Sequence, residues 1–199
     1  MWFEEINILD MIDEYGEKEC KEILFSFSCP LNKDVEAFLH NKAIEFARQH
    51  IAITFLIFMV QDNQKLLVGY YTLANKFLSV PRTPLSKTIR KKMAKFSHYD
   101  EDNDCYMLPI PLIAQLGKNY TYLKGRCIEG TDLLRLACKR VMQVQRMIGG
   151  KMTYIECASN RRLYEFYTNN DFYELGRRET SSGEIEENPA LVQMIRYLS

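Results

Sequence analysis

The stretch from residue 115 to residue 131 combines residue types that bind phosphate groups. Basic side chains and glycines lie in residues 115–118 and 124–126, and Gly130 stands where the longest helical pattern begins. A helix N-terminus presents unpaired backbone N–H groups and the positive end of the helix dipole. Gly130 lets the backbone approach a ligand closely, and Arg126 adds positive charge nearby. The pattern predicts a pyrophosphate-binding site, and an ordinary surface loop is the alternative.

A second group of candidate residues follows a predicted strand in the last quarter of the chain. Asn160 is placed to cap a short helix over residues 161–168. Within that helix Leu163 and Tyr167 share one face, because they are four residues apart. The hydroxyl of Tyr167 could donate a proton to a leaving group, since a phenol stays protonated at neutral pH. The alternative is that Tyr167 and Phe166 are core aromatic residues.

The elements that must position these residues alternate between strands and helices. Apolar residues recur at helical spacing in residues 33–49 and 131–148. β-Branched and aromatic residues predict a hairpin over residues 51–60 and 66–73. The other predicted strands are 107–116, 152–158, 172–177 and 191–198, and the polar stretch 179–189 joins the last two. Strands linked by helices that cross back predict an α/β sheet of mixed direction.

The length of 199 residues fits a single domain. Residues 1–20 are expected to be an N-terminal extension that forms a short helix or strand, and residues 21–27 fit either type. Residues 76–106 are expected to be an inserted helix or loop, because Pro81 and Pro84 break the preceding strand.

The insert carries a basic run followed by an acidic run. The basic residues are Arg82, Lys87, Arg90, Lys91, Lys92 and Lys95, and the acidic ones are Asp100, Glu101, Asp102 and Asp104. A basic surface of this kind can contact RNA phosphates, with aminoacyl-tRNA as the acceptor of a transferred group. The alternative is a solvated helix that the acidic run neutralises.

Composition excludes several classes of protein. The 26 basic and 26 acidic residues give a formal net charge of zero, so no overall attraction to nucleic acid or membrane follows. The longest apolar run, residues 51–60, is about half of the ~20 residues that a membrane helix needs. The N-terminus has no secretory signal pattern, which favours a cytoplasmic protein. The six cysteines and three histidines show no metal-ligand spacing, which predicts free thiols and no metal site.

Four short motifs follow one another along the chain. They are Phe27-Ser28-Cys29 with Val35-Glu36-Ala37-Phe38-Leu39 and Ala43, Gly69-Tyr70-Tyr71-Thr72-Leu73, Pro109-Ile110-Pro111-Leu112-Ile113-Ala114-Gln115-Leu116-Gly117-Lys118, and Phe166-Tyr167-Thr168-Asn169-Asn170-Asp171-Phe172. In type and order they resemble motifs of the GNAT superfamily of N-acetyltransferases, particularly its toxin-type and housekeeping members. The resemblance runs from about residue 25 to the end of the chain.

The resemblance implies a fold, a cofactor and a set of site residues. The fold would be α/β and GNAT-like, with a mixed, mostly antiparallel sheet, flanking helices, and strands splayed at the cofactor cleft. Acetyl-CoA would lie between the strands 107–118 and 152–158 as the acyl donor. The backbone of Leu116, Gly117 and Lys118 would bind the pantetheine arm of acetyl-CoA. Its pyrophosphate would be bound by Arg126, Gly130 and Thr131. Asn160 would lie near the cofactor, and Tyr167 would lie near its sulfur.

The chain departs from the family pattern at two places. Residues 126–131 match the phosphate loop of the family, but only Arg126 and Gly130 clearly correspond to residues of the family pattern. Glu129 would repel phosphate unless its side chain points away. Asp171 replaces the glycine that precedes the closing phenylalanine, Phe172.

The resulting expectation is an N-acetyltransferase that passes the acetyl group of acetyl-CoA directly to a primary amine. Tyr167 would protonate the departing thiolate. Glu156 could act as a base through water, and a structural carboxylate is the alternative. Other readings are a non-catalytic acyl-CoA-binding sensor and a toxin-type acetyltransferase that acts on aminoacyl-tRNA. The sequence is compatible with a homodimer and identifies no antitoxin.

Overall fold

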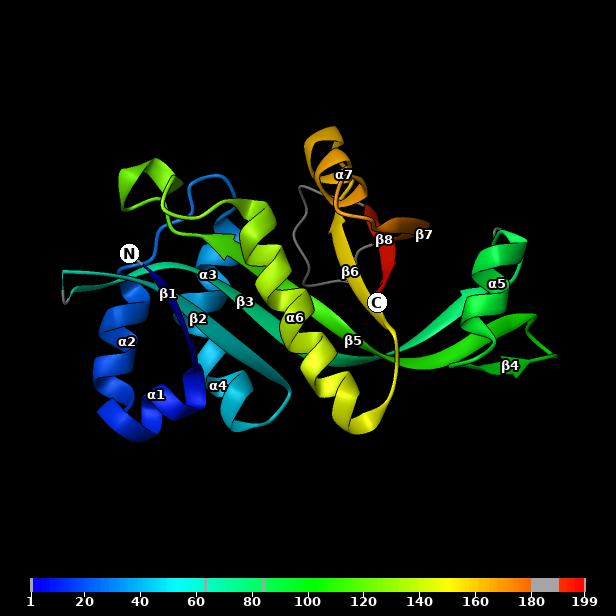
Figure 1. The fold of residues 1–199 in the computed structure, drawn as a ribbon, viewed down its shortest axis with the longest axis horizontal. Helices are drawn as coiled ribbons and strands as arrows, with labels where there is room; N and C mark the ends of the chain where they lie inside the picture. The colour runs from blue at the N-terminus through cyan, green and yellow to red at the C-terminus, as the bar shows by residue number, and fades with distance from the viewer. Residues whose placement is uncertain (1, 63, 84, 180–189, 199) are drawn as a thin grey trace. The chain divides into compact units, whose positions relative to one another are not determined.

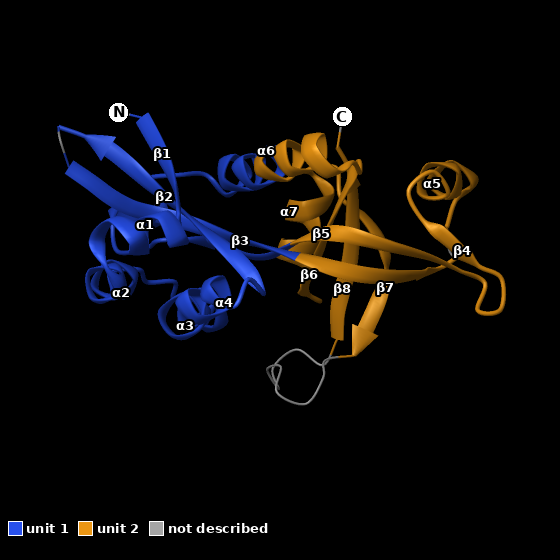
Figure 2. Ribbon diagram, turned by 90° about the horizontal axis from the view of Figure 1, so that it is seen from below, with its two compact units in different colours: residues 1–74, 113–139 blue, residues 75–112, 140–199 orange. Residues whose placement is uncertain are grey.

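A computed structural model describes residues 2–62, 64–83, 85–179 and 190–198. The chain forms two compact units, which share β3, β5 and α6 between them (Figure 2). Unit 1 comprises residues 1–74 and 113–139, and unit 2 comprises residues 75–112 and 140–199. Of the polar connection predicted over 179–189, residues 180–189 lie outside the described residues.

Unit 1 is built from the N-terminal strands and helices. Its elements are β1 (Trp2–Asn7), α1 (Ile8–Tyr15), α2 (Glu17–Phe25), α3 (Lys33–Asn41), α4 (Ala43–Arg48), β2 (Ala52–Gln61), most of β3 (Gln64–Pro81), the end of β5 (Cys105–Lys118), the short helix η1 (Leu123–Gly125) and the start of α6 (Gly130–Ile148). The strand order is β1-β2-β3-β5. The helices α1 to α4 cover one face of these strands, and the start of α6 lies on the other (Figure 2).

Unit 2 contains the rest of the shared elements and the C-terminal strands (Figure 1). Its own elements are α5 (Lys87–Met93), β4 (His98–Asp100), β6 (Met152–Ala158), α7 (Arg161–Thr168), β7 (Tyr173–Glu179) and β8 (Ala190–Tyr197). The strand order is β3-β5-β6-β8-β7, with β4 paired to β5. The ladder between β5 and β6 is parallel and consists of the single pair Leu112–Tyr154, whereas β6, β8 and β7 pair antiparallel. The prediction of a mixed, mostly antiparallel sheet is confirmed.

Each unit has an apolar core that fixes its elements. In unit 1 the side chains of α1 to α4 pack onto β2 and β3 around Leu39, Leu56 and Tyr70, each with no exposed surface. In unit 2, Met93 of α5 and Tyr154 of β6 are equally buried. Burial of such side chains contributes about 1.5–3 kcal/mol each, which explains why the apolar pattern predicts the element type.

Several predicted boundaries are corrected by the structure. The single helix expected over 33–49 is two helices, because Lys42 leaves helical geometry at φ −122° and ψ −27°. The strand β3 runs through Lys76 to Pro81, so the insert expected at 76–106 is partly strand. Residues 21–27 are mostly helical, in α2, and Ile148, expected on the apolar face of α6, is 72% exposed.

The chemical inventory of the described residues agrees with the free thiols expected. None of the six cysteines, all of which lie in the described ranges, forms a disulfide, and all of them except Cys127 are buried. Among these residues no group of histidine, cysteine and acidic side chains is arranged to hold a metal ion. No helix in the described ranges is both long and apolar enough to cross a bilayer.

Candidate active site

The end of β5 in unit 1 requires a glycine. A Cβ atom added at Gly117 would lie 2.4 Å from Cγ1 of Val35, 2.8 Å from Cε1 of Tyr70 and 3.0 Å from Cζ of Phe27. Such distances are far below van der Waals contact, so a side chain here would displace the core. Close packing of α3 and β3 against this strand therefore accounts for Gly117. That its backbone binds a ligand is an expectation from the hydrogen-bonding groups that any strand carries.

Asn119 fastens the residue after β5 to two neighbouring segments of unit 1. Its Nδ2 donates to the carbonyl of Leu67 at 2.7 Å, and its Oδ1 accepts from the N–H of Ser28 and the N–H of Thr121, each at 3.0 Å. The side chain is 1% exposed, and its own N–H donates to the carbonyl of Val68 at 2.9 Å. Since buried polar groups without partners are costly, this network fixes where the loop before α6 begins. Sequence reasoning missed Asn119, whose only signal is its position directly after a strand.

The loop between β5 and α6 has an unusual backbone. Leu123, Lys124 and Gly125 have φ angles of 47°, 51° and 74°, in the left-handed region that favours glycine. A Cβ at Gly125 would come within 2.8 Å of the Tyr120 ring, so only glycine fits there. Arg126 follows this turn with an exposed side chain. The positive φ angles of Leu123 and Lys124 thus strain the backbone of this turn, and the surrounding packing offsets the strain. Strained backbone of this kind is common at ligand-binding segments.

Charge at the start of α6 is mixed. Gly130 and Thr131 are the first residues of α6, and Leu133 anchors the helix with no exposed surface. The carboxylate of Glu129 lies 3.9 Å from Nζ of Lys118, and the Glu129 side chain is 75% exposed. Glu129 is therefore directed toward Lys118 and partly neutralised, which reduces the repulsion of phosphate expected from the sequence.

The helix α7 in unit 2 begins and ends with specific side chains. Oδ1 of Asn160 accepts from the N–H of Leu163 at 2.9 Å, which confirms the predicted N-cap. Tyr167 is 9% exposed, and its ring packs edge-on against Phe166 at 5.0 Å and Phe172 at 5.6 Å. The aromatic ring is thus part of the core, as one reading of the sequence expects.

Asp171 occupies the position where the family pattern has glycine, and its φ is 62°. Aspartate tolerates this conformation better than most residues, because its short polar side chain can form local hydrogen bonds. The carboxylate also lies 3.3 Å from Nη2 of Arg196 on β8. The departure from the pattern therefore preserves the turn geometry that a glycine would provide.

Glu156 on β6 is held by cations from two other strands, β3 and β7, and by one hydroxyl from its own strand. Its Oε1 accepts from Nζ of Lys76 at 2.8 Å, from the Tyr154 hydroxyl at 2.6 Å and from Nε of Arg178 at 2.9 Å. Its Oε2 accepts from Nη2 of Arg178 at 2.7 Å. Gln193 on β8 completes the cluster by donating to the Tyr154 hydroxyl at 2.6 Å.

These contacts decide the chemistry of Glu156. Burial alone would raise the pKa of its carboxyl, but the hydrogen bonds from Arg178, Lys76 and Tyr154 outweigh burial and lower the pKa to about 2. A carboxylate that is this acidic and fully hydrogen-bonded is a weak proton acceptor. Burial also raises the pKa of the neighbouring Cys157 thiol to about 11, so this thiol is not a nucleophile at neutral pH. Glu156 is structural, and sequence reasoning missed its partners Lys76 and Arg178.

The predicted site residues fall into two groups. Leu116, Gly117, Lys118, Arg126, Gly130 and Thr131 lie in unit 1, and Asn160 and Tyr167 lie in unit 2. Within unit 1 the structure brings Lys118 next to Glu129, directly before Gly130. Within unit 2 it places Asn160 and Tyr167 at opposite ends of α7.

Comparison with known proteins gives a likeness of fold and none of sequence. No protein-family model and no curated protein matches the chain. The toxin AtaT, solved with acetyl-methionyl-tRNAfMet, matches with a TM-score of 0.63 and 17% identity over 96% of this chain and 94% of that one. A tyrosine-to-phenylalanine variant of KacT matches with a TM-score of 0.64 and 17% identity over the same shares. AtaTR bound with acetyl-CoA matches with a TM-score of 0.58 and 18% identity, covering 96% of this chain and 91% of that one.

At 17–18% sequence identity, the likeness to these structures is one of backbone fold alone. Strand order, the helix between β5 and β6, and the mostly antiparallel sheet agree with the fold that the four sequence motifs imply. The chain therefore has a GNAT-like α/β fold, which it shares with the solved structures of AtaT and KacT.

Proposed function

We propose that this protein is an N-acetyltransferase that passes the acetyl group of acetyl-CoA directly to a primary amine. The observation that carries the proposal is the match of fold over 96% of the chain to AtaTR, a complex solved with acetyl-CoA. The short ladder of β5 with β6, a single residue pair, is compatible with it.

The site residues of unit 1 fit the pyrophosphate and the pantetheine arm of acetyl-CoA. The first N–H groups of α6, at Gly130 and Thr131, have no carbonyl within the helix to which they could donate, so they suit a pyrophosphate. Arg126 adds an exposed positive charge, and Lys118 draws the Glu129 carboxylate toward itself. Backbone groups of Leu116, Gly117 and Lys118 would pair with the pantetheine arm in the manner of an added strand.

The residues of unit 2 would act on the thioester. Bound acetyl-CoA supplies an acetyl group on a good leaving group. As the amine nitrogen bonds to the acetyl carbon and the C–S bond breaks, the Tyr167 hydroxyl would donate its proton to the departing sulfur. The proton lost by the amine nitrogen would return to the Tyr167 oxygen through solvent. The capped start of α7 at Asn160 keeps the helix in place. The buried Cys157 stays a thiol at neutral pH, which supports direct transfer over a covalent acetyl-cysteine route.

The test is a pair of measurements on the wild type and Tyr167→Phe. Calorimetry with acetyl-CoA measures binding, and release of free CoA thiol with a panel of amines measures turnover. We expect Tyr167→Phe to reduce kcat by ~10² to 10⁴ with unchanged acetyl-CoA affinity. The matched control is Tyr173→Phe, an exposed tyrosine of the same unit. Binding without thiol release by the wild type would favour the non-catalytic sensor, and absence of binding would refute both.

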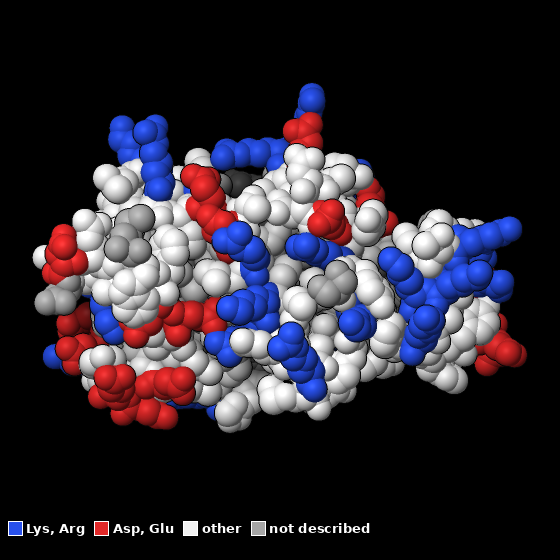
Figure 3. Space-filling view, viewed as in Figure 1, with Lys and Arg blue, Asp and Glu red and all other residues white. Residues whose placement is uncertain are grey.

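We infer, as a second candidate, that the amine belongs to an aminoacyl-tRNA, which is the kind of RNA solved with AtaT. The supporting observation is the basic run around α5, which gathers on one face of unit 2 (Figure 3). Within the described residues, the acidic run forms an ion pair with one member of the basic run, Arg82, whose Nη1 lies 3.8 Å from Asp104. Asp100 instead accepts from the N–H groups of Asp102 and Asn103 in its own turn.

A mobility-shift assay with total tRNA at several salt concentrations tests this candidate. The variant Lys87→Gln/Lys91→Gln removes two exposed charges of α5, and Lys18→Gln/Lys151→Gln removes two exposed charges elsewhere. We expect the α5 variant to bind more weakly and to reduce the log–log salt slope by ~1 to 2, with the control unchanged. Equal binding by both variants, or no salt-sensitive binding at all, would dispose of the RNA acceptor.

A further inference from the structure

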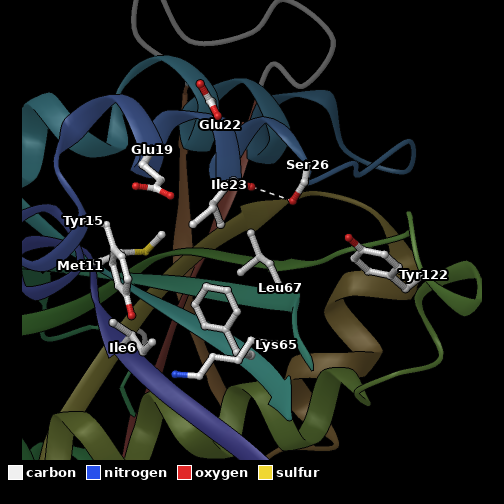
Figure 4. A pocket seen from close by; sticks show the side chains of 11 residues that line it. Ile6, Met11, Tyr15, Glu19, Glu22, Ile23, Ser26, Lys65, Leu67 and Tyr122 are labelled. Atoms are coloured by element: carbon white, nitrogen blue, oxygen red, sulfur yellow. Dashed lines mark hydrogen bonds between the residues drawn. The ribbon is translucent and has the colours of Figure 1, made fainter. Parts of the chain in front are cut away.

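A groove in unit 1 is lined by none of the residues assigned to acetyl transfer above. It has a volume of about 500 Å³, within the range of small-molecule sites, and is open to solvent on one side. Its walls come from β1, α1, α2, β2 and β3 and from the loop that carries Tyr122 (Figure 4). The floor is apolar, formed by Ile6, Met11, Phe58 and Leu67. Such a surface binds the apolar body of a ligand.

The positive charge within the groove is already neutralised. Lys65 is the basic side chain of the lining, and its Nζ lies 2.7 Å from Oε2 of Glu4. That oxygen is buried and has no other partner among the described residues, so Lys65 is committed to it. An anionic ligand would have to displace this pair.

The negative charge of the groove is not neutralised. Glu19 and Glu22 on α2 line the rim, and neither carboxylate has a hydrogen bond or ion pair within the described ranges. On the same helix Glu17 is paired, with Lys21 at 2.6 Å and Arg48 at 2.5 Å. Acidic residues outnumber basic ones across α1 and α2, and the surface view shows acidic side chains gathered over this part of unit 1 (Figure 3). The local potential therefore attracts cations.

Aromatic rings complete the lining. Tyr15 is 44% exposed and lies beside Met11 and Glu19, and Tyr122 lies at the other end beyond Leu67 (Figure 4). A cation over a tyrosine face gains attraction from the ring quadrupole.

We propose that this groove binds a small cationic amphiphile, an organic amine whose apolar body lies on the Ile6–Phe58–Leu67 floor and whose ammonium group faces Glu19 and Glu22. The proposal goes beyond acetyl transfer, since it concerns a ligand site made only of unit 1 residues that take no part in that reaction. The size of the groove limits the ligand to one ring system or a comparable alkyl body.

The test titrates the full-length protein, without acetyl-CoA, against dansylcadaverine, a fluorescent primary amine with an apolar ring system. Its N-acetylated form has the same body without charge, and anilinonaphthalene sulfonate is an anionic probe. We expect dansylcadaverine to bind at least about tenfold more tightly than either, since two exposed carboxylates each contribute a few-fold. The titration contains no acetyl-CoA and measures binding alone, which keeps this test separate from that of the transferase.

Variants on α2 and α1 locate the site. Glu19→Gln/Glu22→Gln should weaken dansylcadaverine by about tenfold and leave the N-acetylated form unchanged. Asp13→Asn, an exposed acidic residue outside the lining, is the control and should change neither. Equal affinity for the charged, neutral and anionic probes, no binding of the amine at 1 mM (roughly the weak limit for a specific site), or no effect of the double variant would each overturn the proposal.

Discussion

Replacing Glu156 by Gln tests whether this carboxylate holds the strands of unit 2 together. Glutamine keeps the shape of the side chain but removes the charge that Lys76 and Arg178 share. The two cations would then face each other across the cluster without an anion between them. Because the Glu156 side chain is only 11% exposed, solvent screens this loss weakly.

The magnitude follows from the pKa of the Glu156 carboxyl, which is lowered from 4.5 to about 2. Each pKa unit corresponds to about 1.4 kcal/mol, so the ionised form contributes roughly 3 kcal/mol to the free energy of unfolding. Because the folded pKa lies below the unfolded one, this contribution is complete above pH ~5 and is lost as the pH falls toward 2. At pH 3 less than about half should remain.

Urea denaturation followed by circular dichroism at pH 7, 4 and 3 measures this contribution. We expect Glu156→Gln to lower the free energy of unfolding by roughly 3 kcal/mol at pH 7, with a difference from the wild type that shrinks as the pH falls. The control Glu174→Gln removes a more exposed pair with Arg177, at 3.4 Å, and should cost less than about 1 kcal/mol. A loss below about 1 kcal/mol for Glu156→Gln, or a pH-independent loss, would refute the assignment of a structural carboxylate.

Two further predictions concern the backbone and are measured by the same denaturation. Gly117→Ala should destabilise unit 1 by ~1–3 kcal/mol because its Cβ meets Val35 at 2.4 Å, whereas Gly176→Ala, with no atom within 4 Å of its Cβ, should change little. A neutral Gly117→Ala would show that the core yields easily there. Leu123→Gly should raise stability by ~0.5–1 kcal/mol, because glycine adopts the observed φ of 47° without strain. A loss of stability would mean that the exposed leucine side chain makes contacts worth more than the strain.

The sequence by itself determined the types and order of most elements. Apolar residues at helical spacing predict α6, and Leu133, Leu134 and Ala137 are fully buried along it. Asn160 caps α7 as expected, because an N-cap depends only on residues within three positions. Local patterns of this kind are readable, since the atoms involved are neighbours in the chain.

Only the tertiary structure decided which distant residues meet. Lys76 and Arg178 reach Glu156 from strands that are 80 and 22 residues away in sequence. That meeting depends on the strand order of the sheet, which gives no periodic signal in the chain. For the same reason the role of Glu156 stayed open between base and structural carboxylate until its partners were known. A carboxylate is acidic or basic according to the charges around it, and those charges are brought together by the fold.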